Sequence, residues 1–311
     1  GDATYVIMPK EVMEMDCLLP YSGDSYYFGS LTEPVSCIVG AFRASYHVAQ
    51  GSYEHAMGIV AGGSMAILAG AGPMGLGAID LALHGDRRPG ILVVTDIDDA
   101  RLARAEALFP REDAKRDGIA LHFVNTAASA DPVADLRAIT GNRGFDDVFV
   151  MAPVAPLIEQ ADRLLAKAGC MNFFAGPTDP EFSAKLNFYD VHYEGHHVVG
   201  TSGGNTEDMR IAIDLMTAGR LNPSIMITHV GGLDSVVETT LNLPTIPGGK
   251  KLMYTNVSMP LTAIDDFAGL GESDPFFAEL ASLVNKHKGL WNGEAEAYLL
   301  KHATPIGDSS E

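Results

Sequence analysis

The chain has 311 residues, 47% of them hydrophobic and 20% charged, a composition typical of a globular α/β protein and unlike that of a disordered or fibrous one. A chain of this length buries more than one core, so we expect two domains. The formal net charge of −19 repels phosphodiester backbones and anionic lipid surfaces, which makes nucleic acid and membranes poor partners.

Cysteine usage and hydropathy bear on the compartment. Cys17, Cys37 and Cys170 are odd in number and widely spaced, so they indicate neither a disulfide framework nor a metal-binding Cys-x-x-Cys pair. No apolar stretch reaches the roughly 18 residues that span a bilayer, and the first residues lack the basic and apolar regions of a secretion signal. We expect a cytoplasmic protein.

Taken in chain order, the segment 4–16 (TYVIMPKEVMEMD) is partly alternating and β-branched, which predicts strands interrupted at Pro9. From Ser64 to Arg220 the pattern changes to repeated units of an apolar strand, a turn and an amphipathic helix. Near-continuous hydrophobic runs are typical of strands buried on both faces. Six such strands are predicted, at Met65–Ala69, Ile91–Thr95, Leu121–Val124, Val148–Met151, Cys170–Phe174 and His197–Gly200. The sequence therefore predicts an α/β fold with a doubly wound, parallel, six-stranded Rossmann sheet.

The helices between these strands carry boundary signals. Asp131 followed by Pro132 predicts a helix start, and Gly169 and Gly219 predict helix ends. After Arg220 the alternation of strands and helices stops. Strands predicted at Met226–Val230 and Lys251–Val257, and a helical stretch at Pro275–Leu300, remain for a second domain.

A glycine-rich segment, Gly70-Ala71-Gly72-Pro73-Met74-Gly75, closes the first predicted strand and opens a helix. Gly70 permits a tight turn, Gly72 has no Cβ to obstruct a pyrophosphate, and Gly75 lets the helix pack on the strand. The helix N-terminus then faces the phosphates. A glycine-rich turn without a ligand is the simpler alternative, but the strand, the helix and a following acidic residue favour a dinucleotide site.

The acidic residue is Asp96, at the end of the second predicted strand and at the usual distance of about twenty residues from the glycines. A carboxylate there accepts hydrogen bonds from the ribose of the adenosine half and repels the 2′-phosphate of NADP. The alternative is that Asp96 caps the next helix, but Asp98 and Asp99 are better placed for that. The sequence therefore predicts NAD as the cofactor.

The nicotinamide half is expected at the carboxyl ends of strands four to six, because open α/β sheets bind ligands at that edge. The residues predicted to line it are Ala152, Pro153, Gly176, Thr201 and Ser202. Individual side-chain roles there are not assigned.

Longer motifs point to a family. They are Glu33-Pro34-Val35-Ser36, GAGPMGLGAID at 70–80, VVTDIDDARL at 93–102, NFFAGPTDP at 172–180, VGTSGGNTEDMR at 199–210 and GRLNPSIMITHVGG at 219–232. With them the chain resembles, over its whole length, the zinc-type medium-chain alcohol and polyol dehydrogenases and, within these, the L-sorbose 1-phosphate reductases. The resemblance implies an oxidoreductase that transfers a hydride between NAD(H) and a polyol or ketose phosphate, assisted by zinc.

The resemblance also implies domains and further site residues. Residues 1–36 would be a remnant of a mostly β, GroES-like catalytic domain, 37–222 the NAD-binding Rossmann domain, and 223–311 the C-terminal part of the catalytic domain. Arg101 would pack on the adenine side of the cofactor, and Glu33 would lie beside the catalytic zinc. The alternative for Glu33 is a surface glutamate before a helix that starts at Pro34. Pairing through the last strand of the sheet would give a dimer or tetramer.

One departure from the family concerns the metal. Members hold zinc with Cys, His and usually Glu ligands, the last two in a Gly-His-Glu step, and no such step occurs here. Glu33 alone cannot hold zinc, so we expect a chain that lacks the first part of its catalytic domain and is not competent by itself. His192, His196 and His197 are interpreted as satisfied histidines and not as a replacement site, because adjacent strand residues point to opposite faces.

A sugar phosphate needs a basic anchor, and Arg43, His47, Lys250 and Lys251 are the candidates, with solvated surface charge as the alternative for each. Two other functions stay open. One is a non-catalytic NAD-binding sensor or interaction module, which the missing zinc ligands would allow. The other is a zinc-independent reductase of the same superfamily, against which the Glu33-Pro34 step argues.

Overall fold

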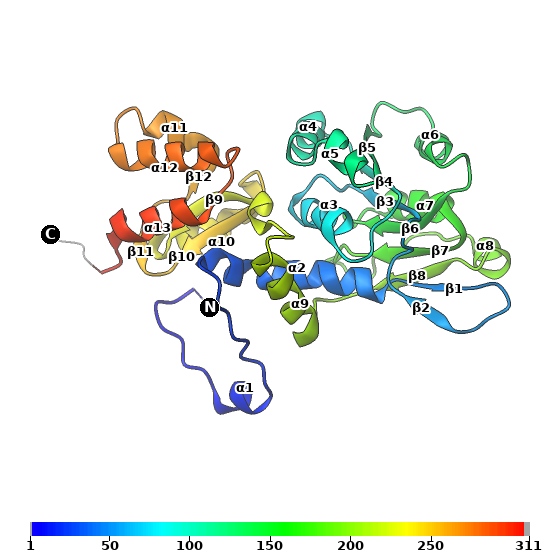
Figure 1. Cartoon of the computed structure of the whole chain (residues 1–311), viewed down its shortest axis with the longest axis horizontal. Helices are drawn as coiled ribbons and strands as arrows, with labels where there is room; N and C mark the ends of the chain where they lie inside the picture. Colours follow the sequence, from blue (N-terminus) through cyan, green and yellow to red (C-terminus); the bar gives the residue numbers. More distant parts are fainter. Residues whose placement is uncertain (1, 308–311) are drawn as a thin grey trace. The chain divides into compact units, whose positions relative to one another are not determined.

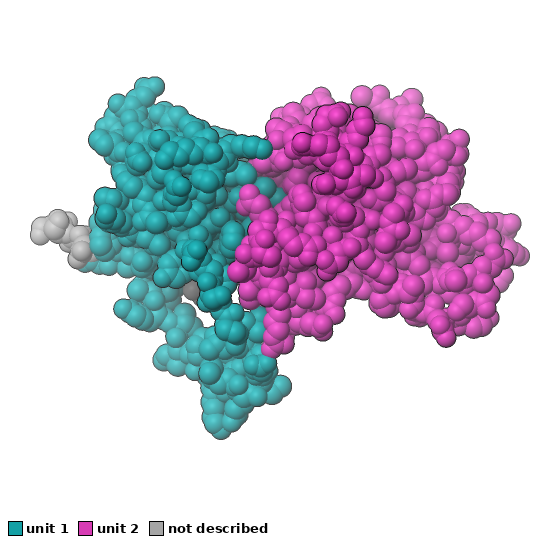
Figure 2. All heavy atoms as spheres, in the orientation of Figure 1, with its two compact units in different colours: residues 1–31, 223–311 teal, residues 32–222 magenta. Residues whose placement is uncertain are grey.

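The structure is a computed structural model that describes residues 2–307 (Figure 1). The chain divides into two compact units, Gly1–Leu31 with Pro223–Glu311 as unit 1 and Thr32–Asn222 as unit 2 (Figure 2). The limits of these units lie after Leu31 and after Asn222, and the limits of the predicted domains lie after residues 36 and 222. Residues 1 and 308–311, which the predicted domains include, lie outside the described residues. Among the described residues no helix has the length and apolar character needed to cross a membrane.

A six-stranded, fully parallel sheet forms the centre of unit 2, as predicted (Figure 1). Its strands are β3 (Ser64–Leu68), β4 (Ile91–Asp96), β5 (Ala120–Asn125), β6 (Phe145–Val150), β7 (Leu165–Phe173) and β8 (His197–Gly200), in the order β5-β4-β3-β6-β7-β8. The chain runs outward from β3 to β5 and returns to the other side of β3 with β6. This reversal between β3 and β6 is the switch point at which doubly wound sheets bind ligands.

Helices cover both faces of this sheet because the side chains of each strand alternate. Leu68 and Val150 pack on one face with Leu136 of α6 (Pro132–Ile139) and Ile158 of α7 (Ala155–Leu164). Phe149 points to the opposite face, where its ring lies 4.8 Å from that of Phe42 in α2 (Tyr26–Ala44). The helices of unit 2 are the larger part of α2 (Tyr26–Ala44), then α3 (Pro73–His84), α4 (Asp99–Leu108), α5 (Arg111–Arg116), α6 (Pro132–Ile139), α7 (Ala155–Leu164), α8 (Phe188–Tyr193) and α9 (Thr206–Thr217). A short hairpin of β1 (Tyr46–Val48) and β2 (His55–Met57) follows α2.

Two of the three predicted helix boundaries are confirmed. The Asp131 side chain accepts a hydrogen bond from the N–H of Ala134 and caps α6, and Gly219 follows α9 with a φ of +68°. The prediction for Gly169 is wrong, because α7 ends at Leu164 and Gly169 lies inside β7. A Cβ on Gly169 would lie 2.8 Å from the carbonyl oxygen of Ala166, so this glycine permits close backbone packing.

The strands predicted for residues 4–16 are also wrong. This segment holds one helical turn, α1 (Lys10–Glu14), and no strand between residues 2 and 16. Pro9 occupies the N-cap position with a φ of −67°, and Lys10 forms an i, i+4 ion pair with Glu14 at 2.6 Å. Lys and Glu are good helix formers. Their local preference therefore outweighs the weak alternation of the apolar residues.

Unit 1 has a small sheet in the order β10-β9-β12, made of β9 (Ile227–Gly232), β10 (Lys250–Tyr254) and β12 (Thr262–Ala263), and a pair of short strands, β11 (Val257–Ser258) and β13 (Thr304–Pro305). The strands predicted at 226–230 and 251–257 correspond to β9 and β10. The predicted helical stretch 275–300 forms two helices, because the helical conformation ends at Lys286 and resumes at Gly293. The helices of this part are α10 (Val236–Asn242), α11 (Phe267–Leu270), α12 (Pro275–Lys286) and α13 (Gly293–His302).

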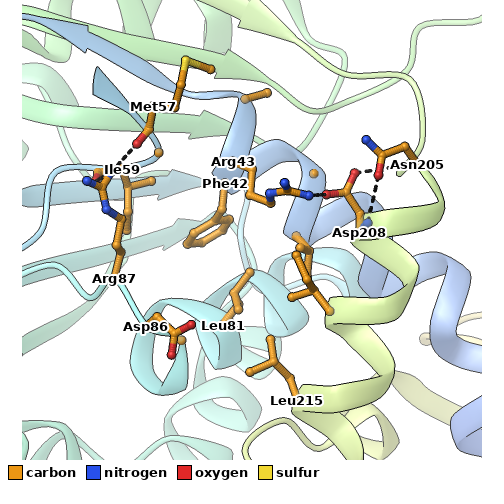
Figure 3. Close-up of a pocket in the computed structure, with 16 residues that line it drawn as sticks. Phe42, Arg43, Met57, Ile59, Leu81, Asp86, Arg87, Asn205, Asp208 and Leu215 are labelled. Carbon is orange, nitrogen blue, oxygen red and sulfur yellow. Dashed lines mark hydrogen bonds and ion pairs between the residues drawn. The ribbon is translucent and has the colours of Figure 1, made fainter. Parts of the chain in front are cut away.

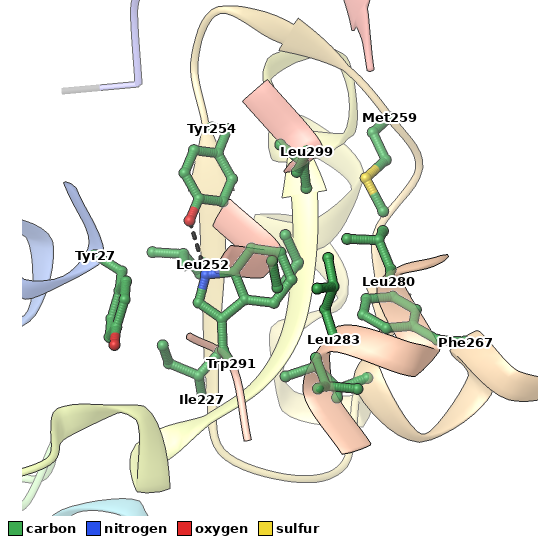
Figure 4. Close-up of a cluster of buried hydrophobic side chains, with 14 of the residues drawn as sticks. Tyr27, Ile227, Leu252, Tyr254, Met259, Phe267, Leu280, Leu283, Trp291 and Leu299 are labelled. Carbon is green, nitrogen blue, oxygen red and sulfur yellow. Dashed lines mark hydrogen bonds between the residues drawn. The ribbon is translucent and has the colours of Figure 1, made fainter. Parts of the chain in front are cut away.

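A hydrogen-bonded chain of buried side chains lies in the core of unit 1, and Figure 4 shows its first link, between Trp291 and Tyr254. The indole Nε1 of Trp291 donates to the hydroxyl of Tyr254 at 2.9 Å, and this hydroxyl donates to Glu296 at 2.6 Å. Glu296 also accepts hydrogen bonds from the N–H groups of Tyr26 and Tyr27, at 2.6 and 2.9 Å. Burial, together with the charge of Glu296, raises the pKa of Tyr254 well above 10. Glu296 therefore caps the start of α2 from a position far along the chain.

Candidate cofactor site

The predicted glycine motif forms the connection between β3 and α3. The strand ends at Leu68, and Ala69 adopts a φ of +53°, so the turn starts in the left-handed region. A Cβ on Gly70 would lie 2.9 Å from the Ile67 carbonyl oxygen, and one on Gly75 would lie 2.1 Å from the Gly70 carbonyl oxygen. A Cβ on Gly72 would have no atom within 4 Å. Two glycines therefore permit packing, and the middle one borders open space.

Helix α3 begins directly after this open space. Gly72 is its N-cap, and because glycine has no side chain, no capping side chain covers the end of the helix. Pro73 is the first residue of the helix. The N–H groups of Met74 and Gly75 belong to the first turn, where helices leave donors unpaired and carry a partial positive charge. This arrangement suits a phosphate group.

Asp96 ends β4 beside the glycine connection. Its side chain is 6% exposed, and one carboxylate oxygen accepts a hydrogen bond from the N–H of Ala71 at 3.2 Å. The other oxygen accepts from the N–H groups of Ile97 at 2.8 Å and Asp98 at 3.2 Å. The carboxylate thus ties the end of the second strand to the loop that follows the first.

The capping of helix α4 falls to Asp98, as expected. Its side chain accepts hydrogen bonds from the N–H groups of Ala100 and Arg101, at 2.9 and 3.1 Å. The Arg101 side chain is 62% exposed, and its Nε lies 3.8 Å from the Asp98 carboxylate. Since Asp98 caps the helix, Asp96 is not needed for that task.

Asn125 was not among the predicted site residues, because the strand that contains it was predicted to stop at Val124. Asn125 ends β5 and is the register partner of Asp96 in β4. Its side-chain amide donates to Asp99 at 2.6 Å. The rule that the carboxyl ends of parallel strands meet at one edge would have identified it.

The five residues predicted around the nicotinamide half lie just after three strands: Ala152 and Pro153 after β6, Gly176 after β7, and Thr201 and Ser202 after β8. Backbone hydrogen bonds join these strand ends. The N–H of Met151 donates to Leu68 at 3.0 Å, and the N–H of Ala175 donates to Val150 at 3.1 Å. The five residues are therefore at the same edge of the sheet as the glycine connection.

Glu33 lies inside helix α2 and not before a helix start. Helix α2 begins at Tyr26, and Pro34 lies inside it, so the prediction of a helix start at Pro34 is wrong. The start is set by the tertiary cap from Glu296, which no local pattern reveals. The Glu33 side chain is exposed and accepts a hydrogen bond from the thiol of Cys37 at 3.2 Å, one turn along α2.

Two of the candidate phosphate anchors are used in other contacts of their own unit. Arg43 forms ion pairs with Asp208 at 2.5 Å and Glu207 at 3.2 Å. The Lys251 ammonium donates to the carbonyl oxygens of Pro247 at 2.7 Å and Gly249 at 2.8 Å. The third candidate, Lys250, is half-buried at the start of β10.

His47, the fourth candidate, lies against the sheet. Its Nε2 is 3.0 Å from the carboxylate of Asp147, and its Nδ1 is 3.2 Å from the carbonyl oxygen of Ala168. Both partners are acceptors, so the ring is best satisfied when both nitrogens carry a proton. Burial by itself would lower the pKa of His47, but the hydrogen bond and the charge of Asp147 outweigh it, and the pKa is raised. His47 is therefore half-buried and paired with the buried carboxyl group of Asp147.

The described residues do not fit a zinc site. Between residues 2 and 307 no group of three or more His, Cys, Asp and Glu side chains is placed to hold a metal ion. His196 and His197 are not satisfied as expected, because Nδ1 of the first and Nε2 of the second are buried without a hydrogen-bond partner. Burial lowers the pKa of both rings.

Known proteins match the sequence along its length. It is 55% identical over 301 residues to a mannitol-1-phosphate 5-dehydrogenase from Aliivibrio fischeri, and the aligned part covers 97% of this chain and 71% of that protein. It is 50% identical over 307 residues to an L-sorbose 1-phosphate reductase from Klebsiella pneumoniae, and the aligned part covers 98% of this chain and 71% of that protein. A family model described as zinc-binding dehydrogenase matches residues 73–218. The chain belongs to the zinc-binding dehydrogenase family, which confirms the resemblance predicted from its motifs.

Solved structures share the fold. A 2R,3R-butanediol dehydrogenase from Bacillus subtilis superposes with a TM-score of 0.58 at 21% identity, over 73% of this chain and 57% of that one. A protein from Sinorhizobium meliloti 1021, assigned as a zinc-binding dehydrogenase and bound to NADP, gives a TM-score of 0.54 at 22% identity, over 73% and 58%. The matched region thus spans less than two thirds of either solved chain. At these identities the similarity shows the fold alone.

Proposed function

We propose that the protein is an NAD-dependent oxidoreductase that transfers a hydride between the cofactor and a polyol phosphate or ketose phosphate. The observation that carries the proposal is the glycine connection, in which Gly70 and Gly75 are held by close packing while Gly72 leaves room for a pyrophosphate. The names of the two relatives, a mannitol-1-phosphate 5-dehydrogenase and an L-sorbose 1-phosphate reductase, support the substrate class.

The choice of NAD over NADP rests on Asp96. An ionised carboxylate offers about four lone-pair sites, and backbone N–H groups use three of those on Asp96. One site remains for a ribose hydroxyl, while a 2′-phosphate at the same place would meet a negative charge. The Sinorhizobium protein binds NADP, so the proposed preference of this chain for NAD over NADP rests on its own Asp96 carboxylate and not on that neighbour.

When bound, NAD supplies the carbon that accepts or gives the hydride. The residues of unit 2 would hold it in three ways. The first turn of α3 would bind the pyrophosphate, Asp96 would orient the adenosine ribose with Arg101 on the adenine side, and Ala152, Pro153, Gly176, Thr201 and Ser202 would border the nicotinamide.

Zinc assistance is typical of the family, and Glu33 is the residue that the resemblance places beside the metal. Because the described residues hold no zinc site, we expect the 311-residue chain by itself to bind NADH without turning over substrate. The second candidate function, a non-catalytic NAD-binding sensor or interaction module, rests on the same observation. Turnover of L-sorbose 1-phosphate or mannitol 1-phosphate by the 311-residue chain would support the oxidoreductase and would contradict both the expected inactivity of this chain and the sensor or interaction module.

We also propose that two copies pair through β8. This strand is at the edge of the sheet, and its Val198 side chain is 47% exposed. An exposed edge of this kind can continue into a second sheet. Sedimentation of the protein tests the pairing, and replacing Val198 with Lys should weaken it.

The cofactor proposal is tested by calorimetric titration with NADH and NADPH. Gly72→Ala adds a methyl group in open space next to the first turn of α3, so the variant should fold normally. We expect its NADH affinity to fall at least about tenfold, because the methyl occupies the space of the pyrophosphate.

Gly269→Ala is the matched control. Gly269 lies in α11 of unit 1, and a Cβ there also meets no atom within 4 Å. This variant should bind NADH as the unchanged protein does. No measurable binding of either coenzyme by the folded protein would overturn the proposal, and so would equal binding by the two variants.

A further inference from the structure

Unit 2 contains a cavity of about 640 Å³ that is separate from the candidate cofactor site (Figure 3). The glycine connection lies at the start of α3, whereas Leu81 and Gly85 border the cavity at the other end of that helix. A helix of twelve residues spans about 18 Å. The two sites are therefore at opposite ends of the same helix.

Most of the cavity wall is apolar. Side chains from α2, from the end of β2 and the connection to β3, from α3 and from α9 converge on it (Figure 3). The apolar ones are Val39, Phe42, Met57, Ile59, Leu81, Ile211 and Leu215. Small-molecule sites in proteins commonly have volumes of about 300–1,000 Å³ and linings of this kind. The size and the wall suit the apolar body of a small ligand.

Three of the four charged residues that line the cavity have a partner of opposite charge. Arg43 forms an ion pair with Asp208 at 2.5 Å, and Asp208 also belongs to the capping box of α9. Asp86 forms an ion pair with Arg220 at 2.8 Å. Arg43 and Asp208 therefore neutralise each other, and Asp86 is paired with Arg220, which does not line the cavity.

Arg87 is the exception. Its Nη1 donates to the carbonyl oxygens of Met57 and Ile59, the second at 3.3 Å. Gly58 permits this approach, because a Cβ there would lie 2.7 Å from Nη1. Within residues 2–307 no carboxylate pairs with Arg87, and its Nε and Nη2 make no hydrogen bond. The rim of the cavity thus carries one guanidinium, on an exposed side chain, that two carbonyl oxygens hold in place and no carboxylate pairs with.

We propose that this cavity is a second ligand site, which binds an apolar molecule with a single carboxylate, such as a medium-chain fatty acid. The apolar chain would lie against Phe42 and Leu215, and the carboxylate would accept hydrogen bonds from Arg87. A guanidinium recognises a carboxylate through paired, charge-assisted hydrogen bonds. The site does not depend on the function proposed for the glycine connection.

Octanoate is the probe, and octanamide, which has the same chain without the charge, is its matched control. Calorimetric titration of the 311-residue protein should show saturable binding of one octanoate per chain, with octanamide about tenfold weaker or worse. Saturating NADH should leave the octanoate affinity unchanged. Competition between the two would place octanoate at the glycine connection and overturn the proposal, as would the absence of saturable octanoate binding.

Two neighbouring arginines offer a matched pair of variants. Arg87→Gln should weaken octanoate binding about tenfold, whereas Arg88→Gln should leave it within about twofold, since Arg88 does not line this cavity. Ile211→Trp should fill the cavity and abolish binding, and Leu215→Phe is a milder filling variant if the first does not fold. Equal weakening by both glutamine variants, or undiminished binding by a folded filling variant, would overturn the proposal.

Discussion

The carboxylate of Asp96 accepts a hydrogen bond from the N–H of Ala71, so the residue proposed to select the coenzyme also fixes the loop proposed to bind its phosphates. Both residues are buried. A change at Asp96 is therefore expected to alter two properties, coenzyme preference and local stability, and the two can be measured separately.

Asp96→Asn removes the charge and keeps the shape of the side chain. We expect the ratio of the Kd values for NADPH and NADH to fall about tenfold, because a repulsion of about 1.4 kcal/mol corresponds to a tenfold difference in binding. Asp96→Gly should also relax the preference, but at a larger cost in stability, because three N–H groups lose their acceptor. Calorimetry with both coenzymes measures the ratio, and an unchanged ratio in Asp96→Asn would exclude the ribose role.

Gly75→Ala tests the packing of α3 on the glycine connection. The new Cβ would lie 2.1 Å from the Gly70 carbonyl oxygen, so the helix must move. We expect a loss of about 2 kcal/mol in the free energy of unfolding, measured by urea denaturation. Gly72→Ala should change it by no more than about 0.5 kcal/mol. Equal stabilities of the two variants would contradict the separate tasks of these glycines.

The His47–Asp147 pair predicts a pH dependence. The pKa of His47 is raised above 6.5 in the folded protein, so its stabilising contribution is complete below about pH 6.5 and is lost as the pH rises through the raised value. We expect His47→Ala to cost about 3 kcal/mol at pH 6, because Asp147 loses its partner, and less at pH 9.

Urea denaturation of the two proteins at both pH values gives this difference. Comparing the variant with the unchanged protein is necessary because Asp80 raises the pKa of His84 in the same direction. A difference that stays constant between pH 6 and pH 9 would show that His47 is not protonated in the folded protein.

Glu296→Gln tests the cap of α2. The carboxylate accepts hydrogen bonds from two N–H groups of α2 and from the hydroxyl of Tyr254, and an amide offers only one acceptor oxygen. We expect a loss of about 2 kcal/mol in the free energy of unfolding. Glu294→Gln is the control, since Glu294 is 60% exposed and only 3.7 Å from Lys286, and should cost less than about 0.5 kcal/mol. A similar loss in both variants would argue against the cap.

Metal removal separates the cofactor site from the family's zinc chemistry. The groups proposed to bind NADH are backbone N–H groups and Asp96, and the described residues hold no metal cluster. Dialysis against a chelator should therefore leave the Kd for NADH unchanged. A loss of NADH binding that added zinc restores would show that the metal supports the cofactor site.

The Rossmann unit could be predicted because its signals are local. Each buried strand is a run of apolar residues in sequence, and the cap at Asp131 lies three residues from the N–H that it accepts. The capping box of α9, in which Asn205 and Asp208 exchange hydrogen bonds with each other's backbone, is equally local, although it was not among the predictions.

The features that the sequence did not reveal depend on distant partners. The start of α2 depends on Glu296, which is 270 and 269 residues away from the two residues whose N–H groups it accepts. Pro34 was therefore misread as the first residue of the helix. Gly169 was misread as a helix end because its close neighbour, the carbonyl oxygen of Phe145, comes from an adjacent strand. The roles of Arg43 and His47 likewise follow from partners in other elements.

The division of tasks between Asp98 and Asp96 has an evolutionary consequence. Since the cap of α4 is secured by Asp98, a mutation of Asp96, the residue proposed to select the coenzyme, would leave the start of the helix behind it in place. Descendants of this chain could therefore shift between the catabolic and the biosynthetic coenzyme pool through a single codon, provided that the loop around Ala71 finds another acceptor.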